Sequence, residues 1–298
     1  MLDFRIETFL AVCRSMNFTR ASEQLNITQP AVSQHIRFLE NYYQAKLFRY
    51  EGKKLQLTRA GEILRSASLT MMHDELSMRS QMQKADTGEQ IRFGATRTVG
   101  DVLMGKILKR YLREYPDADI HMIVENTREL LRQLDEGAID FALVEGFFKK
   151  NEYDFQKFSD ENYIAVAGPD YPFRNRPDRI ENLFQERLLL REEGSGTREV
   201  LERWLEAQNL GIRDFERIVE AGSLHTIKEL TKAGCGITFL YEVAVKEDLE
   251  KGTLVKIPLQ DFRASHEFTF IWRRGSIYAD RYRELFRRFS GQAALHTL

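Results

Sequence analysis

Residues 27–40, with the sequence ITQPAVSQHIRFLE, carry short polar side chains at helical spacing. A helical wheel places one set of them on a single side, namely Gln29, Pro30, Ser33, Gln34, Arg37 and Asn41. Amide, hydroxyl and guanidinium groups of this kind read base edges in the DNA major groove, where glutamine suits adenine and arginine suits guanine or phosphate. Taken alone, the segment also fits the solvated face of an ordinary structural helix.

The start of this helix is predicted from Pro30, because proline lacks an amide hydrogen and is tolerated only in the first helical turn. Thr28 is a favoured N-cap residue, and its hydroxyl would accept from the amide of Ala31. Ile27 and Val32 are spaced as a hydrophobic staple. The buried stripe is expected to contain Val32, Ile36, Leu39 and Tyr43.

The neighbouring segments predict the elements that would position this polar face. Upstream, Ile6, Phe9, Leu10 and Cys13 keep helical spacing in a first helix, and FTRASEQLN offers Thr19 as a cap, Ala21 and Leu25 as an inner face and Asn26 as a left-handed stop. Two short helices joined across Asn26 form a helix-turn-helix. Downstream, KLFRYEGKKLQLT alternates around Glu51 and Gly52 as a hairpin does, so Arg49, Lys53 and Lys54 would form a basic wing.

A second group of candidate residues follows residue 88, where strands alternate with helices. The predicted segments are IRFGAT, residues 101–114, DIHMIV, residues 127–136, DFALVEG, NYIAVAG, RLLLREEG, residues 197–207, RIVEA, residues 224–233, GITFL, LVKIPL, EFTFIW and residues 278–289. This alternation predicts parallel sheet covered by helices. The last strand and helix would complete the first series, which gives two lobes with a cleft between them.

Open parallel sheets bind ligands beyond the carboxyl ends of their strands, where helix N-termini also point. The residues at these positions are Thr96, Arg97, Thr98, Glu145, Gly146, Glu193, Ser195, Gly196 and Thr197. In EEGSGTR, two glycines permit close backbone approach, and two hydroxyls stand at a helix start, which suits an anion. The nearby Arg97, Arg191 and Arg198 favour an anionic guest, with or without an amine. A glycine-rich turn with a Ser or Thr cap is the alternative explanation.

The stretch from Thr58 to Gly88 predicts one long helix, because it contains no proline and stays polar on one side. Its apolar residues follow a four-three step with a gap at Asp74, and they are Ala60, Leu64, Ala67, Met71, Met78 and Met82. This spacing is typical of a coiled-coil seam. We therefore expect a dimer, whose two-fold symmetry would match two DNA half-sites. Packing of the helix against the chain's own body is the alternative.

The composition agrees with a DNA-binding front end on an acidic body. The chain has 298 residues and a formal net charge of −1, but residues 1–60 carry nine Lys or Arg against five Asp or Glu. Its two cysteines, Cys13 and Cys235, exclude a disulfide framework. The short apolar runs and the charged N-terminus predict neither a membrane span nor a secretion signal, so we expect a cytoplasmic protein.

Enzymes are disfavoured as a class. A nucleophile elbow needs glycine two residues before its serine, and Glu193 occupies that position before Ser195. The six histidines never pair at zinc-motif spacing, and no GxxxxGK[ST] segment occurs, so we expect no catalytic residues, no metal and no cofactor. A solute-binding protein would share the two-lobed plan, but it would have no use for the first 60 residues.

The run FLAVCRSMNFTRASEQLNITQPAVSQHIRFLE, followed by LF and LTRAG, resembles the LysR-type transcriptional regulators, and the resemblance extends over the whole chain. REEGSGTR also resembles a subgroup that includes regulators of sulfur and carbon assimilation. The resemblance implies a tetramer of two dimers that binds double-stranded promoter DNA and alters transcription when a small metabolite enters the cleft. RNA polymerase is a candidate further partner. Gln44 and Tyr50 depart from the family, which usually has glycine and arginine at these positions.

The resemblance also implies roles for particular residues. The DNA contacts would come from Thr28, Gln29, Pro30, Ala31, Ser33, Gln34 and Arg37, with Arg49 and Lys53 on the wing. The effector contacts would come from Thr96, Thr98, the region of Glu145, Ser195 and Thr197. The expected fold class is an α-helical winged helix-turn-helix domain (1–58), a linker helix (59–88), and an α/β effector domain (89–298) like the two-lobed periplasmic binding proteins. Lobe I would contain 89–160 and 267–298, and lobe II would contain 161–266.

Overall fold

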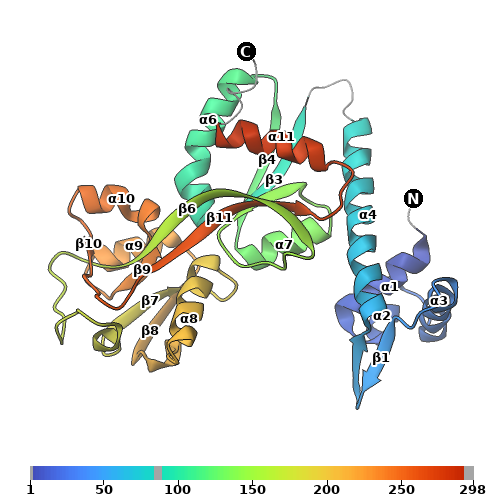
Figure 1. Ribbon diagram of the computed structural model, residues 1–298, viewed down its shortest axis with the longest axis horizontal. Helices are drawn as coiled ribbons and strands as arrows, with labels where there is room; N and C mark the ends of the chain where they lie inside the picture. The colour runs from blue at the N-terminus through green and yellow to red at the C-terminus, as the bar shows by residue number, and fades with distance from the viewer. Residues whose placement is uncertain (1–2, 84–88, 292–298) are drawn as a thin grey trace.

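The protein's structure, a computed structural model, describes residues 3–83 and 89–291. Figure 1 shows a small helical unit with a hairpin, a single long helix that leads out of it, and a larger unit in which helices surround a curled sheet. The larger unit has two lobes, with the long helix standing against one of them. The arrangement confirms the predicted fold class, whereas the domain boundaries at residues 58 and 88 stay predictions.

The N-terminal unit has the predicted helix-turn-helix and hairpin. Its elements are α1 (Phe4–Ser15), α2 (Phe18–Leu25), α3 (Gln29–Tyr42), β1 (Phe48–Glu51) and β2 (Lys54–Leu57). The hairpin turns at Gly52, whose φ of 61° is accessible to glycine without strain. Apolar residues of all three helices and the hairpin form one core, including Phe9, Ala21, Val32, Ile36, Leu39 and Leu47.

Several local predictions can be compared with these helices. Thr28 caps α3 by accepting from the Ala31 amide at 3.3 Å, and Asn26 adopts φ 53°, so both predictions are confirmed. Thr19 is not a cap, because Asn17 accepts from the amides of Thr19 and Arg20, and α2 begins at Phe18, two residues earlier than a Thr19 cap would place it. The prediction that Tyr43 joins the core is wrong: α3 ends at the preceding residue, and Tyr43 is 47% exposed.

The long helix α4 (Arg59–Gln83) packs one side against the larger unit. His73 Nε2 lies 3.1 Å from the carbonyl oxygen of Ile139, and Ser77 donates to Asp140 at 2.6 Å. Asp74, the gap in the predicted seam, is buried on this side and accepts from Ser276. Packing against the chain's own body therefore explains this face. Of the apolar residues in the predicted coiled-coil seam, Met71, Met78 and Met82 are exposed. Ile63, which was not part of that prediction, is exposed on α4 as well. The predicted continuation to Gly88 lies outside the described residues.

The lobe next to α4, lobe I, contains β3 (Gln90–Thr96), β4 (Asp119–Glu125), β5 (Phe141–Val144), α5 (Arg97–Val99), a π-helical turn η1 (Gly100–Met104), α6 (Gly105–Glu114), α7 (Thr127–Asp135) and α11 (Ala279–Ser290). Strand β3 pairs in parallel with both β4 and β5, as predicted. The chain becomes helical directly after β3, four residues earlier than expected, because α5 and η1 precede α6.

Lobe II contains η2 (Ile180–Leu183), β7 (Arg187–Arg191), α8 (Gly196–Ala207), η3 (Ile212–Asp214), β8 (Arg217–Ala221), α9 (Leu224–Lys232), β9 (Thr238–Tyr241), α10 (Glu242–Glu250) and β10 (Val255–Lys256). Strands β7 and β8 pair in parallel. Helix α10 was not predicted from the sequence, and it covers β9 and β6.

Two long strands run between the lobes and change the predicted sheet. Strand β6 (Tyr153–Ala167) pairs antiparallel with β11 (Ala264–Arg273), and β6 also pairs with β9 and β10. Strand β11 pairs antiparallel with β5, so it completes the first series as predicted. The expected parallel pairing is thus confirmed for β3 with β4 and β5 and for β7 with β8, but the main sheet as a whole is mixed, with the order β10-β6-β11-β5-β3-β4.

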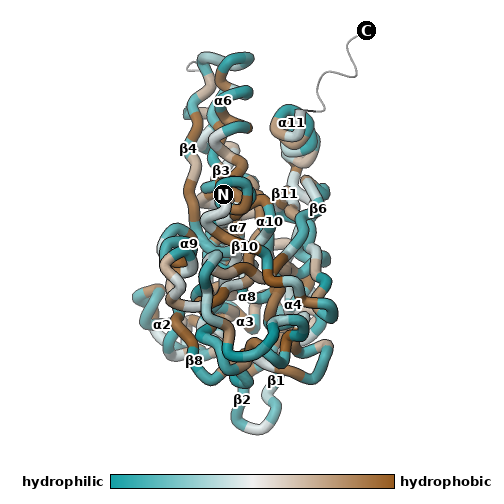
Figure 2. The backbone as a smooth tube through the Cα atoms, turned by 90° about the vertical axis from the view of Figure 1, so that its left-hand side faces the viewer, coloured by the Kyte–Doolittle hydropathy of each residue, from teal (hydrophilic) through white to brown (hydrophobic). Residues whose placement is uncertain are grey.

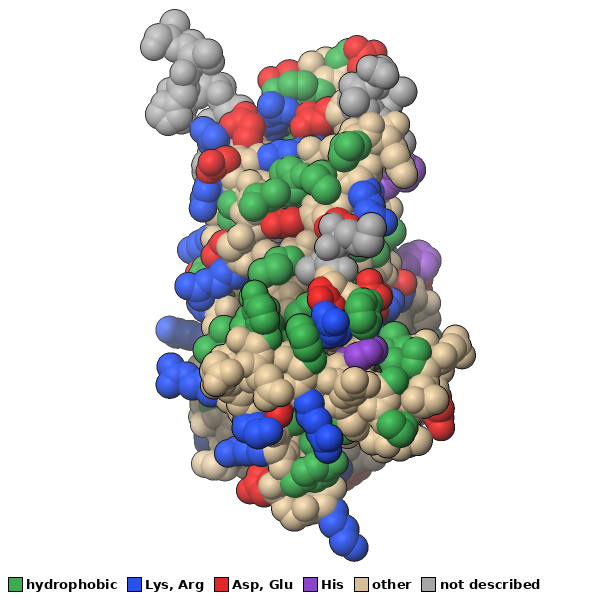
Figure 3. Space-filling model, turned by 90° about the vertical axis from the view of Figure 1, so that its right-hand side faces the viewer, with side chains coloured by type: hydrophobic (Ala, Val, Ile, Leu, Met, Phe, Trp, Pro, Cys, Tyr) green, Lys and Arg blue, Asp and Glu red, His purple; other side chains and the backbone are tan. Residues whose placement is uncertain are grey.

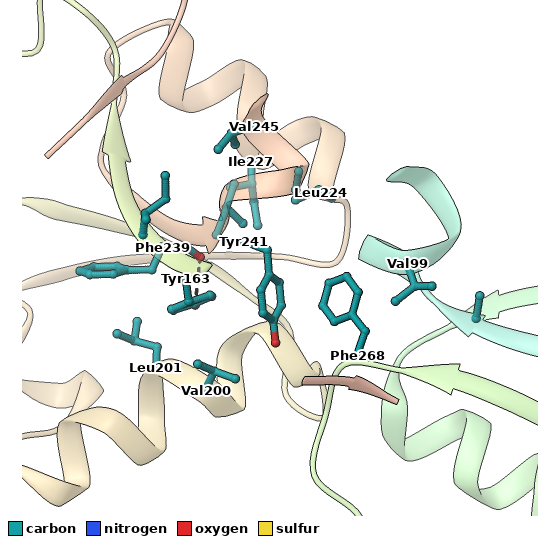
Figure 4. Close-up of a cluster of buried hydrophobic side chains, with 14 of the residues drawn as sticks. Val99, Tyr163, Val200, Leu201, Leu224, Ile227, Phe239, Tyr241, Val245 and Phe268 are labelled. Atoms are coloured by element: carbon teal, nitrogen blue, oxygen red, sulfur yellow. Dashed lines mark hydrogen bonds between the residues drawn. The ribbon is translucent and has the colours of Figure 1, made fainter. Parts of the chain in front are cut away.

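Apolar segments of the strands lie inside both lobes, whereas polar segments follow the outer turns (Figure 2). At the junction of the lobes, the Tyr241 ring contacts the rings of Tyr163 and Phe268, with centroids 5.2 and 4.9 Å apart (Figure 4). One apolar core therefore extends through the junction. It supports the strand ends at which the candidate effector residues lie.

Helix α4 is tied to lobe I by polar contacts at the opposite end of the sheet from the candidate effector residues. The buried Arg273 at the end of β11 donates to Asp135 of α7 at 2.7 Å and to the carbonyl of Ser66 at 3.1 Å. Arg65 donates to Glu152 at 2.6 Å. A shift of α7 or β11 would therefore act directly on the helix that leads to the N-terminal unit.

Candidate DNA-binding and effector-binding sites

A groove of about 710 Å³ separates the N-terminal half of α3 from the hairpin. Of the predicted DNA-binding residues, it brings together Gln29, Ser33, Arg37, Arg49 and Lys53. Thr28, Pro30 and Gln34 are exposed outside its lining, and Ala31 is partly buried. Blue Lys and Arg side chains lie scattered among uncharged ones at the lower end of the molecule in Figure 3. The groove thus presents the amide, hydroxyl and guanidinium groups side by side, open to solvent.

Intramolecular contacts pre-arrange part of this groove. Gln29 Nε2 donates to Ser33 Oγ at 3.0 Å, one helical turn away. On the hairpin, Arg49 of β1 donates to Gln56 of β2 at 3.4 Å, so its side chain lies along the two-stranded sheet. Glu40 accepts from the Leu47 amide at 3.0 Å, which fixes β1 relative to the recognition helix α3. The contact between Glu40 and β1 therefore helps to set the angle between helix and wing. In the described part of the chain, Lys46 of the groove pairs with Glu40 at 2.6 Å, whereas no carboxylate pairs with Arg37, Arg49 or Lys53.

Sequence reasoning missed other residues of this groove. Phe18, Thr19, Lys46 and Tyr50 also line it. Thr19 was interpreted as a cap, and its position in the first turn of α2 follows only once Asn17 is identified as the cap. Gln44 has φ 50°, which explains why glycine would be the easier residue at this position.

The candidate effector residues meet where the two lobes touch. Thr96 ends β3, Thr98 lies in α5, Glu145 and Gly146 follow β5, and Ser195 is the N-cap residue of α8. Thr96, Thr98, Glu145 and Ser195 are at most 2% exposed, as is Thr197, and Gly146 is buried as well. The structure therefore assembles one buried polar cluster from segments of both lobes.

Hydrogen bonds across this cluster join the lobes. Thr197 donates its hydroxyl to Glu145 Oε1 at 2.7 Å, and the hydroxyls of Thr98 and Thr197 are 3.2 Å apart. Tyr241 donates to the carbonyl of Glu145 at 3.2 Å. A methyl group on Gly196 would lie 2.6 Å from the backbone of Gly146. The cleft is consequently closed at this point.

Several buried polar atoms in and beside the cluster lack a hydrogen-bond partner within the described part of the chain. They are Thr96 Oγ1, Thr127 Oγ1, Glu145 Oε2, Arg191 Nη1 and Ser195 Oγ. Buried polar groups are ordinarily satisfied, and unpaired ones cost about 1–3 kcal/mol each. Thr127 is the first residue of α7, so the unpartnered hydroxyls include those at the N-termini of two helices. A small polar ligand between the lobes would satisfy such atoms.

Two predicted effector residues lie at the rim. Glu193 is exposed and accepts from Arg128 at 3.0 Å. Arg97 pairs with Glu125 at 3.5 Å and with Glu192 at 3.8 Å. These three pairs are partly or largely solvent-exposed, so they lie outside the buried polar cluster.

Thr127, Tyr163 and Tyr241 are the residues of the cluster that sequence reasoning did not single out. Thr127 follows β4 at its carboxyl end, so the rule that selected Thr96 would also have selected it. Tyr163 donates to the carbonyl of Thr197 at 2.7 Å. No sequence signal distinguishes the two tyrosines from core residues.

Burial dominates the protonation of the cluster. It raises the pKa of Glu145, although the hydroxyls of Thr197, Thr98 and Thr96 and the charge of Arg191 oppose it. It also raises the pKa of Tyr163 and Tyr241 well above the usual range. Arg191 donates to the neighbouring Glu192 at 2.8 Å, and this pairing contributes to the lowered pKa of Glu192 despite its burial. The charge of Arg191 is therefore largely balanced without Glu145.

Neither a metal-binding cluster nor a membrane-spanning helix is found in the described residues. No group of three or more His, Cys, Asp or Glu side chains is placed to hold a metal ion among them. None of the described helices combines the length and apolar character that a membrane span requires. Cys13 and Cys235 are both free thiols, and both are partly buried.

Comparison with known families and relatives gives a consistent result. Residues 5–62 match the family of bacterial regulatory helix-turn-helix proteins, lysR family, and residues 84–293 match the LysR substrate binding domain. The transcriptional regulator YeiE of Escherichia coli K12 is 29% identical over 257 residues, which cover 86% of each chain. The regulator CysL of Bacillus subtilis is 26% identical over 269 residues, which cover 89% of each chain.

Solved structures share the fold. OxyR of Corynebacterium glutamicum with bound H2O2 has a TM-score of 0.60 at 24% identity, covering 96% of this chain and 91% of that one. LysG of the same organism with its effector Arg has a TM-score of 0.60 at 17% identity, covering 98% and 99%. The regulatory domain of Synechocystis CcmR with 2-PG has a TM-score of 0.61 at 18% identity, covering 70% and 99%.

Proposed function

We propose, for a chain that belongs to the LysR family of bacterial helix-turn-helix transcriptional regulators, that a small anionic metabolite bound between its lobes switches its reading of promoter DNA. The chain is a DNA-binding regulator with an effector-binding domain, and it is not an enzyme. Beyond this family-level function, we propose which side chains contact DNA and that the effector is negatively charged.

The groove between α3 and the wing supports the assignment of DNA contacts. Gln29, Ser33 and Arg37 project into it from successive turns of α3, where they would reach base edges in the major groove. Arg49 and Lys53 on the wing would contact phosphates, which position the domain without reading sequence. Pro30, Ala31, Thr28 and Gln34 complete the proposed set at the helix N-terminus.

The single observation that carries the effector assignment is the set of unpartnered buried donors between the lobes. Hydroxyls of Thr96, Thr127 and Ser195 and one nitrogen of Arg191 lack partners in the part of the chain that the structure describes. Backbone amides at the start of α7 and α8 add positive partial charge there. The related fold of CcmR holds 2-PG, whereas that of LysG holds Arg, so the charge of the guest depends on the residues of each cleft.

An oligomer would couple the cleft to DNA. The exposed Ile63, Met71, Met78 and Met82 on α4 form an apolar surface that a second copy would cover. A dimer through α4, paired into a tetramer, presents several DNA-reading heads whose spacing changes when the lobes move. RNA polymerase is a proposed further partner of the DNA-bound form.

Calorimetry with matched variants tests the effector proposal. Sulfate, phosphate and acetate should bind the full-length protein, whereas arginine should not. Ser195→Ala and Thr98→Ala proteins should bind the same anions about tenfold or more weakly, because a hydrogen bond to a charged group contributes roughly 1.5–3 kcal/mol. Ser290→Ala, in α11, serves as the control. Unchanged titrations in both cleft variants would contradict the proposal, and so would binding of arginine alone.

A further inference from the structure

We infer, on the premise of the anion-binding function proposed above, that Glu145 is a neutral acid in the effector complex and donates a hydrogen bond from Oε2 to an effector oxyanion. Binding of the effector in the closed cleft is then accompanied by the uptake of one proton by Glu145. The effector class is then a compact oxyanion that requires a hydrogen-bond donor where a deprotonated carboxylate would repel it.

The geometry of Glu145 sets this requirement. Its Oε1 already accepts from Thr197 at 2.7 Å, but its Oε2 is buried and has no partner among the described residues. The same cluster holds the unpartnered hydroxyls of Thr96 and Ser195. An anion that accepts from these hydroxyls would meet the carboxyl group of Glu145 at close range. Two like charges in such a dry site are strongly unfavourable, and one proton between them removes the conflict.

Every element packed around Glu145 leaves its charge without a dedicated counter-ion. Arg191 of β7 is the cation that acts on it, but Arg191 is already paired with Glu192 through two hydrogen bonds. Arg97 at the rim also pairs with Glu192 and with Glu125. Tyr163 and Tyr241, from β6 and β9, are neutral phenols whose pKa values are raised well above their usual range. The burial that raises the pKa of Glu145 therefore favours its acid form.

The closed cleft also limits the size of the guest. The backbones of Gly146 and Gly196 are so close that even a methyl group on Gly196 would lie 2.6 Å from Gly146. Thr98 and Thr197 already touch across the junction. A guest that preserves these contacts has little apolar body, as in an inorganic oxyanion or a one- or two-carbon acid.

Sulfate is the appropriate probe, because it carries no proton of its own near neutral pH. Calorimetry in buffers of different ionisation enthalpy measures the protons taken up per sulfate bound, between about pH 5.5 and about pH 9.5. The full-length protein should take up close to one proton above the pKa of Glu145 in the free protein. Over that range its affinity for sulfate should fall about tenfold per pH unit.

The Glu145→Gln variant tests the protonation of Glu145 separately from the proposal that the effector is an anion. The amide keeps a donor without a titratable charge, so the variant should bind sulfate with an affinity that does not change with pH and with no proton uptake. Glu136→Gln, on the exposed end of lobe I, is the matched control and should keep the wild-type proton uptake.

The outcomes are distinguishable. Sulfate, phosphate or acetate binding without proton uptake at any pH would overturn the role of Glu145 while leaving the anionic effector intact. Proton uptake that persists in Glu145→Gln, or loss of sulfate binding by a folded Glu145→Gln protein at every pH, would also overturn it. Failure of every anion to bind would instead refute the proposed function itself.

Discussion

Arg65 of the linker helix α4 donates to Glu152 of lobe I at 2.6 Å, and both side chains are mostly buried. Beside this pair, Arg273 connects α7 to the backbone of α4 through Asp135 and Ser66. Helix α7 begins at Thr127 in the buried polar cluster and ends at Asp135, so one rigid element joins the junction of the lobes to the linker helix.

Arg65→Ala is therefore expected to weaken communication between effector and DNA. The coupling free energy between anion binding and operator binding should fall by about 0.5–2 kcal/mol, with smaller effects on either ligand alone. Operator titrations with and without saturating effector measure this quantity. Arg79→Ala, which removes an exposed pair on the same helix, is the control. An unaltered coupling free energy in Arg65→Ala would contradict the connection.

Gly196→Ala tests whether closure of the lobes accompanies effector binding. The added methyl group would lie 2.6 Å from the Gly146 backbone and 2.8 Å from Glu145 Cγ, so the lobes must separate to admit it. We expect effector binding to fall at least tenfold while DNA binding without effector persists. Gly105→Ala, where nothing lies within 4 Å, should leave effector binding unchanged. Wild-type effector affinity in Gly196→Ala would show that the ligand does not need this closed junction.

Gln44→Gly should stabilise the N-terminal domain. Gln44 has φ 50°, a conformation that costs an L-residue about 1–2 kcal/mol, whereas the extra chain entropy of glycine costs about 0.5–1 kcal/mol. The net gain in the free energy of unfolding is therefore expected to be about 0.5–1 kcal/mol, measured by urea denaturation. Gln56→Gly in β2, a strand position whose side chain accepts from Arg49, should be destabilising. A loss of stability in Gln44→Gly would show that its side chain contributes more than its backbone costs.

Asp74 should make the contact between α4 and lobe I sensitive to acid. Burial alone would raise its pKa, but hydrogen bonds from His73, Ser276 and the Ile277 amide outweigh it and lower the pKa below 3.8. A depressed carboxyl pKa contributes stability above the ordinary value, and this contribution is lost as pH falls through the folded-state pKa.

Asp74→Asn is thus expected to lower the free energy of unfolding by about 1–3 kcal/mol at neutral pH, and by less only as the pH falls below the ordinary carboxyl value of 3.8. Denaturant titrations at several pH values give the comparison, with the exposed Asp101→Asn as control. A penalty that stays constant down to acid pH would mean that the charge of Asp74 is not what stabilises the contact.

The best sequence predictions concerned features that neighbouring residues determine. Thr28 and Pro30 define the start of α3 within one turn, and Asn26 adopts the left-handed conformation that its residue type favours. The wing followed in the same way from alternation around Gly52. Strand ends selected most of the effector cluster, because the carboxyl edge of a parallel sheet collects residues from distant segments.

Features that depend on tertiary partners were not predictable. Asp74 interrupts an apolar seam for no local reason, and its partners Ser276 and Ile277 lie some two hundred residues away. The length of β6 and its antiparallel pairing with β11 depend on a strand near the other end of the chain. Tyr163 and Tyr241 look like core residues in sequence, and only the folded junction turns their hydroxyls toward Thr197 and Glu145.

The central claim is that the polar face of α3 reads bases, and Gln29→Ala tests it most directly. Binding to a library of single-base operator variants at fixed salt should show a loss of about 1–3 kcal/mol at the specific site and a relaxed preference at one base pair. Gln81→Ala, an exposed glutamine of α4, should leave the profile unchanged. Equal weakening on every sequence, with all base preferences retained, would assign Gln29 to the DNA backbone and contradict the claim.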